Sequence, residues 1–107
     1  WVHIGDHCMI QGGALVTQDI PPYIIATNGE THYAGINKIG LSRRGFTEEQ
    51  IASIHNTCRI LFQSELNYFA GCDKAEAELP ESPERNKLIE FIRASKRGVI
   101  KQYMSKR

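Results

Sequence analysis

Aliphatic residues recur at every sixth position in the first twenty residues of the chain. Ile4, Ile10 and Val16 carry this period, and small or polar residues lie between them. An amphipathic helix needs apolar spacings of three and four residues, and a half-buried strand needs alternation, so neither fits. The period is typical of a hexapeptide β-helix, in which each hexad forms a short strand and three hexads complete a triangular coil. We therefore expect these side chains to point into the coil; the alternative is a chance alignment in a glycine-rich loop.

The repeat is expected to end at the segment Asp19-Ile20-Pro21-Pro22-Tyr23. Two consecutive prolines donate no backbone hydrogen bonds and cannot continue an interior strand. A single coil cannot bury its own inner face. Residues 1–22 are therefore expected to be the final hexapeptide coil of a longer β-helix, followed by an exit loop over 23–34 and a C-terminal helical domain over 35–107. The chain opens with Trp1 rather than Met, which suggests a fragment or a processed product.

A clear helical pattern lies in the middle of the chain. Thr47 and Gln50 have the spacing of a capping box. The apolar residues that follow at spacings of three and four are Ile51, Ile54, Cys58, Leu61 and Phe62. This pattern predicts a helix over residues 48–62, with His55 packed or half-exposed at the border of the apolar stripe.

Two shorter helices are expected on either side of this one. The first lies within residues 35–45 and is closed by Gly45, with Arg43 and Arg44 in its last turn. Cations there complement the negative end of the helix dipole. The second is a segment rich in Ala and Glu over residues 72–79.

The last predicted helix covers residues 83–96. Ser82 is a suitable N-cap, and Pro83 is well tolerated at the first helical position. The residues expected on its buried face are Leu88, Phe91, Ile92 and Ser95. The fold class predicted from these patterns is the end of a β-helix followed by a small helical domain.

Composition and charge narrow the possible functions only slightly. The 107 residues are 41% hydrophobic and 23% charged, which is ordinary for a globular domain, and we expect neither a signal peptide nor a transmembrane segment. A net charge of +1 is too weak to imply a nucleic-acid partner. The last fifteen residues hold six basic side chains and no acid, which indicates either a solvated tail or a landing site for an acidic partner.

The cysteine and histidine residues do not form a metal-binding pattern. Cys8, Cys58 and Cys72 are odd in number and widely spaced, and the four histidines lack the usual zinc-ligand spacings. We expect inert thiols in a reducing compartment, with no metal and no other cofactor.

Several short motifs in the chain resemble a known enzyme family. They are Gly35-Ile36-Asn37, Gly40-Leu41, Arg43-Arg44-Gly45-Phe46-Thr47 and Ser95-Lys96-Arg97-Gly98-Val99-Ile100. Together with the terminal coil, they resemble the C-terminal part of the acyl-[acyl-carrier-protein]–UDP-N-acetylglucosamine O-acyltransferase family. The resemblance implies the last coil of a left-handed parallel β-helix followed by a small C-terminal helical domain, in a cytoplasmic homotrimer.

The activity that this resemblance implies is the first step of lipid A biosynthesis. The family transfers a 3-hydroxyacyl chain from acyl carrier protein to the sugar 3-hydroxyl of UDP-N-acetylglucosamine. Its general base is a histidine on an upstream coil, and neither His3 nor His7 matches it, so the isolated chain is expected to be inactive. The alternatives are another hexapeptide-repeat acyltransferase acting on a sugar nucleotide, or a non-catalytic trimerising or binding module.

The resemblance also implies a nucleotide site formed by Asn37, Arg43 and Arg44. Guanidinium groups suit phosphate, and an amide can donate to and accept from a uracil edge. The alternatives are helix-terminal charges for the arginines and a capping or turn role for Asn37. Ile39 stands where the family often has an acidic residue, which puts a side-chain contact to the nucleotide from that position in doubt.

Three further positions correspond to the acyl groove of the family, where side-chain bulk limits the length of the chain that is accepted. They are Met9, Gly12 and His32. A glycine leaves room and a methionine adapts its shape. The alternative for Met9 and Gly12 is a β-helix corner with a packed methionine.

Overall fold

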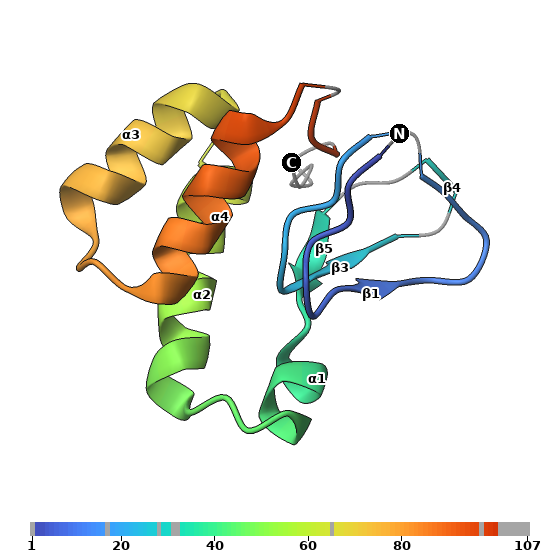
Figure 1. The fold of residues 1–107 in the computed structure, drawn as a ribbon, viewed down its shortest axis with the longest axis horizontal. Coiled ribbons are helices and arrows are strands. Elements are labelled where there is room, and N and C mark those ends of the chain that lie inside the picture. Colours follow the sequence, from blue (N-terminus) through green and yellow to red (C-terminus); the bar gives the residue numbers. More distant parts are fainter. Residues whose placement is uncertain are drawn as a thin grey trace.

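The computed structural model of the protein describes residues 2–16, 18–27, 29–30, 33–64, 66–96 and 98–100. The strands lie on one side of the molecule and three helices on the other (Figure 1). The strands are β1 (Met9–Ile10), β2 (Ala14–Leu15), β3 (Ile24–Ala26), β4 (Gly29–Glu30) and β5 (Tyr33–Ile36). The helices are α1 (Lys38–Arg43), α2 (Glu48–Gln63), α3 (Tyr68–Glu78) and α4 (Pro83–Ala94).

The first thirty residues form two stacked turns of chain. Strand β1 pairs in parallel with β3, β2 pairs in parallel with β4, and Ile4 forms a parallel bridge with Ile20. Partners lie 15 or 16 residues apart. The prediction that three full hexads complete a turn is therefore wrong, because three hexads would place the partners 18 residues apart and each observed turn is two or three residues shorter.

The two prolines do not end this pairing. The Gly5 N–H donates to the Ile20 carbonyl at 2.7 Å before them, and the Tyr23 N–H donates to the Asp6 carbonyl at 2.9 Å after them. Proline is tolerated where the ladder requires no donor. The segment 23–34, expected as an exit loop, consequently contains β3 and β4.

A tight corner recurs at the same position in both turns. His7 and Tyr23 both adopt left-handed backbone conformations, with φ of 62° and 76°. Their rings stack with centroids 6.0 Å apart. A Cβ at Gly5 would lie 2.4 Å from the Pro22 nitrogen, so only glycine lets the two turns approach this closely.

The aliphatic residues of the first turn are only half covered. Ile20 and Ala26 are fully buried, whereas their partners Ile4 and Ile10 are 48% and 36% exposed. Paired residues of parallel strands point to the same face, so Ile4 and Ile10 point the same way as the buried pair. They are exposed because no described strand lies beyond the first turn, in line with the expectation that a coil does not bury its own inner face; Val16 packs against the core.

The second turn is covered by segments from later in the chain. Strand β5 pairs antiparallel with β3, and Val99 forms a parallel bridge with Asp19. The Asp19 N–H donates to the Gly98 carbonyl at 2.7 Å, and the Ile100 N–H donates to the Asp19 carbonyl at 3.0 Å. Residues 98–100 thus add a third layer beside the two turns.

The predicted helices are largely confirmed. The capping box of Thr47 and Gln50 is present, and Ser82 caps α4 by accepting from the Arg85 N–H. Helix α3 begins earlier than predicted, because the Asn67 side chain accepts from the Ala70 N–H and caps it.

The predicted buried face of α4 needs two corrections. Ile89, which was not on the predicted face, is buried, while Phe91 is only half-buried. The helix ends at Ala94, and Ser95 lies just beyond it.

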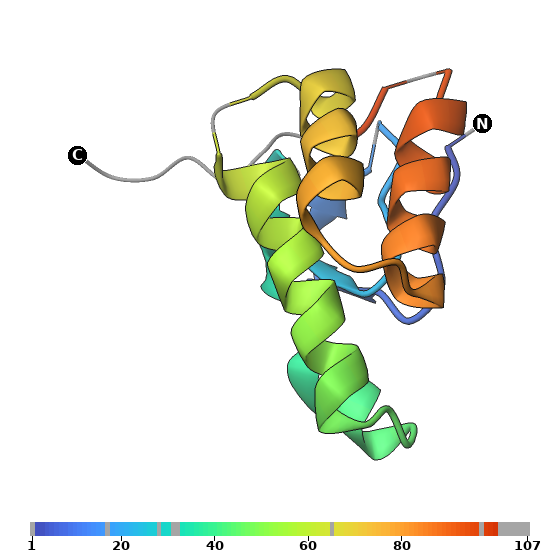
Figure 2. The same ribbon diagram turned by 90° about the vertical axis from the view of Figure 1, so that its left-hand side faces the viewer.

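The core lies between the strands and the three longer helices, which pack side by side (Figure 2). The Phe62 ring stacks on Tyr33 of β5 with centroids 4.3 Å apart, and it meets Tyr68 of α3 edge to face at 5.7 Å. Phe62 therefore joins the strand layer to two helices.

Candidate functional site

The segment around α1 joins the helical part of the protein to the corner of the coil. Asn37 precedes α1; its backbone N–H donates to the Tyr23 carbonyl at 2.7 Å, and its side-chain amide donates to the His7 carbonyl at 3.1 Å. The side chain makes no capping bond to α1, and the residue is only 8% exposed. Asn37 therefore has a structural contact with the coil, and its expected nucleotide contact stays a prediction.

The residues that follow α1 also have structural roles. The Phe46 ring meets the rings of His7 and Tyr23 edge to face, with centroids 5.0 and 5.9 Å apart. Gly45 has a φ of 89°, a conformation that favours glycine and lets the chain leave the helix. Thr47 caps α2. Three of the five residues in the motif Arg43-Arg44-Gly45-Phe46-Thr47 are thus engaged in the fold.

Arg43 and Arg44 differ from the rest of this motif. Both are exposed at the C-terminal end of α1, and neither side chain forms an ion pair or hydrogen bond with any other described residue. They lie roughly 9 Å along the helix from Asn37, given the rise of an α-helix. Two unpaired guanidinium groups can bind an anion such as phosphate through charge-assisted hydrogen bonds.

Ile39 lies on the same helix face as Arg43. It precedes Arg43 by four positions, and residues so spaced are neighbours on a helix surface. Ile39 is 69% exposed. The solvent-facing surface of α1 therefore carries an apolar side chain beside a cation and no carboxylate.

The residues expected to line an acyl groove lie on the first turn of the coil. Met9 of β1 is half-exposed, and a Cβ at Gly12 would meet nothing within 4 Å. Met9 lies on the outer turn that no described strand covers, so its expected place in an acyl groove stays a prediction. His32 lies outside the described residues.

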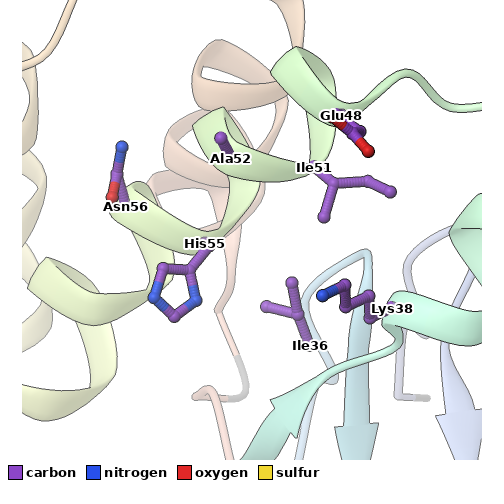
Figure 3. Close-up of a pocket in the computed structure, with 7 residues that line it drawn as sticks. All are labelled: Ile36, Lys38, Glu48, Ile51, Ala52, His55 and Asn56. Atoms are coloured by element: carbon purple, nitrogen blue, oxygen red, sulfur yellow. The ribbon is translucent and has the colours of Figure 1, made fainter.

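A groove that sequence reasoning missed lies between α2 and the start of α1. It has a volume of about 390 Å³. Figure 3 shows Ile51 and His55 of α2 across from Ile36 and Lys38. His55, which was expected to be packed or half-exposed beside the apolar stripe, is exposed and lines this groove. The groove forms between separate elements of the fold. Its only link to a predicted site is that two of its lining residues, Ile36 and Lys38, flank Asn37 in the sequence.

The basic residues near the C-terminus are only partly described. Arg93 donates to Glu76 at 2.7 Å and to Asp73 at 2.8 Å, so it is paired within the helical domain. Lys96 is exposed. The remaining basic residues of this tail, at positions 97, 101, 106 and 107, lie outside the described residues.

The titratable groups give no indication of a metal site. No three His, Cys, Asp or Glu side chains of the described residues are grouped so that they could hold a metal ion. Burial raises the pKa of the Cys8 and Cys72 thiols to about 11 and that of Cys58 further above its ordinary value. All three cysteines are free thiols. Among the described helices, none is both long and apolar enough to cross a membrane.

A family model described as UDP N-acetylglucosamine O-acyltransferase, domain 2, matches residues 19–100. The chain belongs to this family. The acyl-[acyl-carrier-protein]–UDP-N-acetylglucosamine O-acyltransferase of Myxococcus xanthus is 42% identical over 101 residues, which cover 94% of this chain and 39% of that protein. The enzyme of the same description from Burkholderia orbicola is 36% identical over 109 residues, covering 94% and 40%.

Solved structures of UDP-N-acetylglucosamine acyltransferases share the fold of this family member. The protein from Bacteroides fragilis 9343 matches with a TM-score of 0.91 and 50% identity over 94% of this chain and 40% of that chain. The protein from Acinetobacter baumannii matches with a TM-score of 0.87 and 30% identity over the same shares. The chain thus spans about two fifths of the length of the relatives that it matches.

Proposed function

We propose that the chain is the C-terminal part of an acyltransferase that moves a 3-hydroxyacyl group from acyl carrier protein to the 3-hydroxyl of UDP-N-acetylglucosamine, in lipid A biosynthesis. Family membership supports the reaction class. The observation that carries the proposal for this chain is the pair of exposed arginines, Arg43 and Arg44, in a motif whose other members are engaged in the fold.

The nucleotide end of the site lies at α1 in this proposal. Arg43 and Arg44 bind the phosphates of UDP, because guanidinium groups donate paired hydrogen bonds in a planar fork that matches phosphate oxygens. Asn37 belongs to the same end of the site. Ile39 supplies no polar contact to the nucleotide, since its side chain carries neither a donor nor an acceptor.

The acyl end of the site lies along the first turn of the coil, at Met9 and Gly12. His32, which lies outside the described residues, is assigned to the same groove by the resemblance alone. The half-exposed thioether of Met9 and the open space at Gly12 support this part of the proposal. An acyl chain that lies over Gly12 gains contact area with Met9, whose flexible side chain adapts to irregular apolar surfaces.

The rest of the machinery belongs to the longer protein. In this proposal the turns formed by β1 to β4 end a left-handed parallel β-helix, β5 leads from them to α1, and the helices belong to the helical domain of a cytoplasmic homotrimer. A histidine on an earlier coil removes the proton of the sugar hydroxyl as it attacks the thioester, and the isolated chain is inactive. The parallel stacking of two turns and the three free thiols support this architecture and a reducing compartment.

Calorimetric titration of the intact protein with UDP-N-acetylglucosamine tests the nucleotide end. Replacing both Arg43 and Arg44 by Gln should weaken binding by at least about tenfold, because two charge-assisted phosphate contacts are lost. The matched control is Arg59→Gln, which removes an exposed arginine from α2 and should leave the affinity unchanged. Equal losses in both proteins would contradict the proposal.

Acyl transfer by the intact protein tests the reaction and the groove together. With 3-hydroxyacyl carrier proteins of graded chain length, Gly12→Met should shift the preference to shorter chains, because the added side chain fills open space. Nucleotide binding without any acyl transfer would favour the non-catalytic binding module instead.

A further inference from the structure

The groove between α2 and the start of α1 has apolar walls that face solvent. Its volume is about 390 Å³, and one wall is formed by α2 while the other follows the end of β5 (Figure 3). Ile36 and Ile51 are only half-buried, and Ala52 is exposed. Covering apolar surface of this kind is favourable, because it removes that surface from water. The groove is therefore suited to a segment of chain with apolar side chains.

The last described residue, Ile100, is fixed at the C-terminal end of α2. The Tyr68 hydroxyl donates to the Ile100 carbonyl, and the Tyr68 ring meets Phe62 of α2 edge to face. Phe62 in turn stacks on Tyr33, the first residue of β5. Ile100 is fully buried. The chain beyond residue 100 therefore starts beside the end of α2 and the beginning of β5.

Both α2 and β5 lead from this point to the groove. His55 lies seven positions before Phe62 in α2, which corresponds to about 10 Å along the helix. Ile36 lies three positions after Tyr33 in β5, which is also about 10 Å. Glu48, at the far end of the groove, is about 21 Å along α2 from Phe62.

Seven residues, Lys-Gln-Tyr-Met-Ser-Lys-Arg, follow Ile100 in the sequence. They lie outside the described residues, and the family model that matches this chain ends at residue 100. An extended chain advances about 3.3 Å per residue, so seven residues span about 23 Å. Residues 103 and 104 can therefore reach as far as His55, and residues 106 and 107 can reach Glu48.

We propose that residues 101–107 bind in this groove of the same chain, as a strap over the surface between α2 and the start of α1. Tyr103 and Met104 are the large apolar side chains of the segment. In the groove they cover its apolar lining, which consists of Ile36, Ile51 and Ala52.

The charges of the segment fit the far end of the groove. Glu48 supplies the carboxylate in the groove lining, and it is exposed. Lys106 and Arg107 come beside it and form ion pairs, which fix the direction of the segment rather than supply most of its binding. Lys38 lies across the groove from Glu48 (Figure 3), where it faces the uncharged middle of the segment.

Disulfide formation in the intact protein tests this placement. With His55→Cys and Met104→Cys, oxidation by diamide should link the two introduced thiols within one chain. The matched control pairs Met104→Cys with Lys74→Cys, an exposed position of α3 that lies about 9 Å along the helix from Tyr68 and is therefore equally within reach. The link to position 55 should form at least about tenfold faster, because a docked segment holds its thiol at a high effective concentration.

Charge reversal tests the ion pairs at the far end. Glu48→Lys should slow the link between positions 55 and 104 about threefold, as expected for exposed ion pairs. Lys106→Glu with Arg107→Glu should restore the rate in that background. Glu49 is exposed on the same turn of α2 but does not line this groove, so Glu49→Lys should leave the rate unchanged.

Two outcomes would overturn the proposal. Equal rates at positions 55 and 74 would show that the segment has no fixed place, because it would then meet both thiols alike. Links between chains, seen as dimers on a non-reducing gel, would show that the groove takes the segment of a second copy instead. Both readouts need no substrate, so the result is independent of the proposed function.

Discussion

The Ser95 hydroxyl donates a 2.6 Å hydrogen bond to the carboxylate of Asp19, a residue 76 positions earlier in the chain. The other carboxylate oxygen accepts from the His3 N–H at 2.8 Å. Asp19 is 1% exposed, and its backbone pairs with Gly98 and Ile100. One buried carboxylate therefore joins the two turns of the coil to the segment that follows α4.

Replacing Ser95 with Ala should destabilise this junction. The buried Asp19 carboxylate loses a donor, and the Gly98 N–H loses the Ser95 hydroxyl as its acceptor at 3.1 Å. We expect the free energy of unfolding, measured by urea denaturation, to fall by about 1–3 kcal/mol. Ser42→Ala, at an exposed position of α1, should change it by less than about 0.5 kcal/mol. Similar losses in both variants would show that the hydrogen bond to Asp19 contributes nothing.

Phe62 and Phe69 offer a comparison between a core contact and a surface contact. Phe62 is 1% exposed and touches the rings of Tyr33 and Tyr68, whereas Phe69 is 63% exposed. Phe62→Ala leaves a cavity between β5, α2 and α3, and should reduce the free energy of unfolding by about 3–5 kcal/mol. Phe69→Ala should change it by less than about 0.5 kcal/mol. Thermal unfolding monitored by circular dichroism measures both variants. A loss of stability in Phe62→Ala no larger than that in Phe69→Ala would show that this ring packing is unimportant.

The ion pairs of Arg93 make a part of the stability dependent on pH. The hydrogen bond from Arg93 holds the pKa of the Glu76 carboxyl below its ordinary value. A lowered pKa in the folded state contributes stability above the pKa of the unfolded chain, about 4.3, and this contribution is lost as pH falls through the folded value. Wild type should therefore be more stable than Glu76→Gln at pH 7, and the difference should shrink as the solution is acidified.

The control for this experiment is Glu78→Gln. Glu78 is exposed and forms no ion pair with any described residue. Added salt should reduce the Glu76 effect, because both partners are solvent-accessible. A difference that stayed constant as the pH fell through the lowered, folded pKa of Glu76 would contradict the role of the ion pair.

The cysteines should react slowly with thiol reagents in the folded protein. At pH 8 a thiol whose pKa is about 11, as for Cys8 and Cys72, is about one part in a thousand thiolate. Burial raises the pKa of Cys58 further still. Because these folded pKa values exceed that of a free thiol, stability should fall as pH rises above about 8.5. Ellman's reagent should titrate all three thiols rapidly only in denaturant.

The helices could be predicted because their signals are local. The capping box of Thr47 and the cap of Ser82 act within three residues, and apolar spacing identifies a buried stripe without reference to its partner. The start of α3 was missed because α3 has only a weak apolar stripe, and an asparagine can be recognised as an N-cap only when a clear helical pattern follows it. Helix α4 ends before its predicted limit, since the backbone of Ser95 is extended, with a ψ of 122°.

The candidate site was predictable only as a set of residue types. The motif around Arg43 and Arg44 indicated an anion site. Only the structure shows that Phe46 packs on the coil, whereas the side chains of Arg43 and Arg44 form no ion pair with any described residue. The groove beside His55 was missed, because it forms between α2 and the start of α1, whose residues lie ten or more positions earlier in the chain.

The caps of α2 and α4 and the apolar stripes of these helices follow from side chains that interact within a few residues of one another, so the amino-acid sequence alone determines them. The 15- or 16-residue pairing of the turns, the Asp19–Ser95 hydrogen bond and the Asn37–His7 hydrogen bond depend on partners far apart in the chain. A six-residue period is compatible with more than one parallel register. The identity of a polar side chain does not predict which distant carbonyl group it will bind. Packing of the helices against the corner of the coil selects those partners.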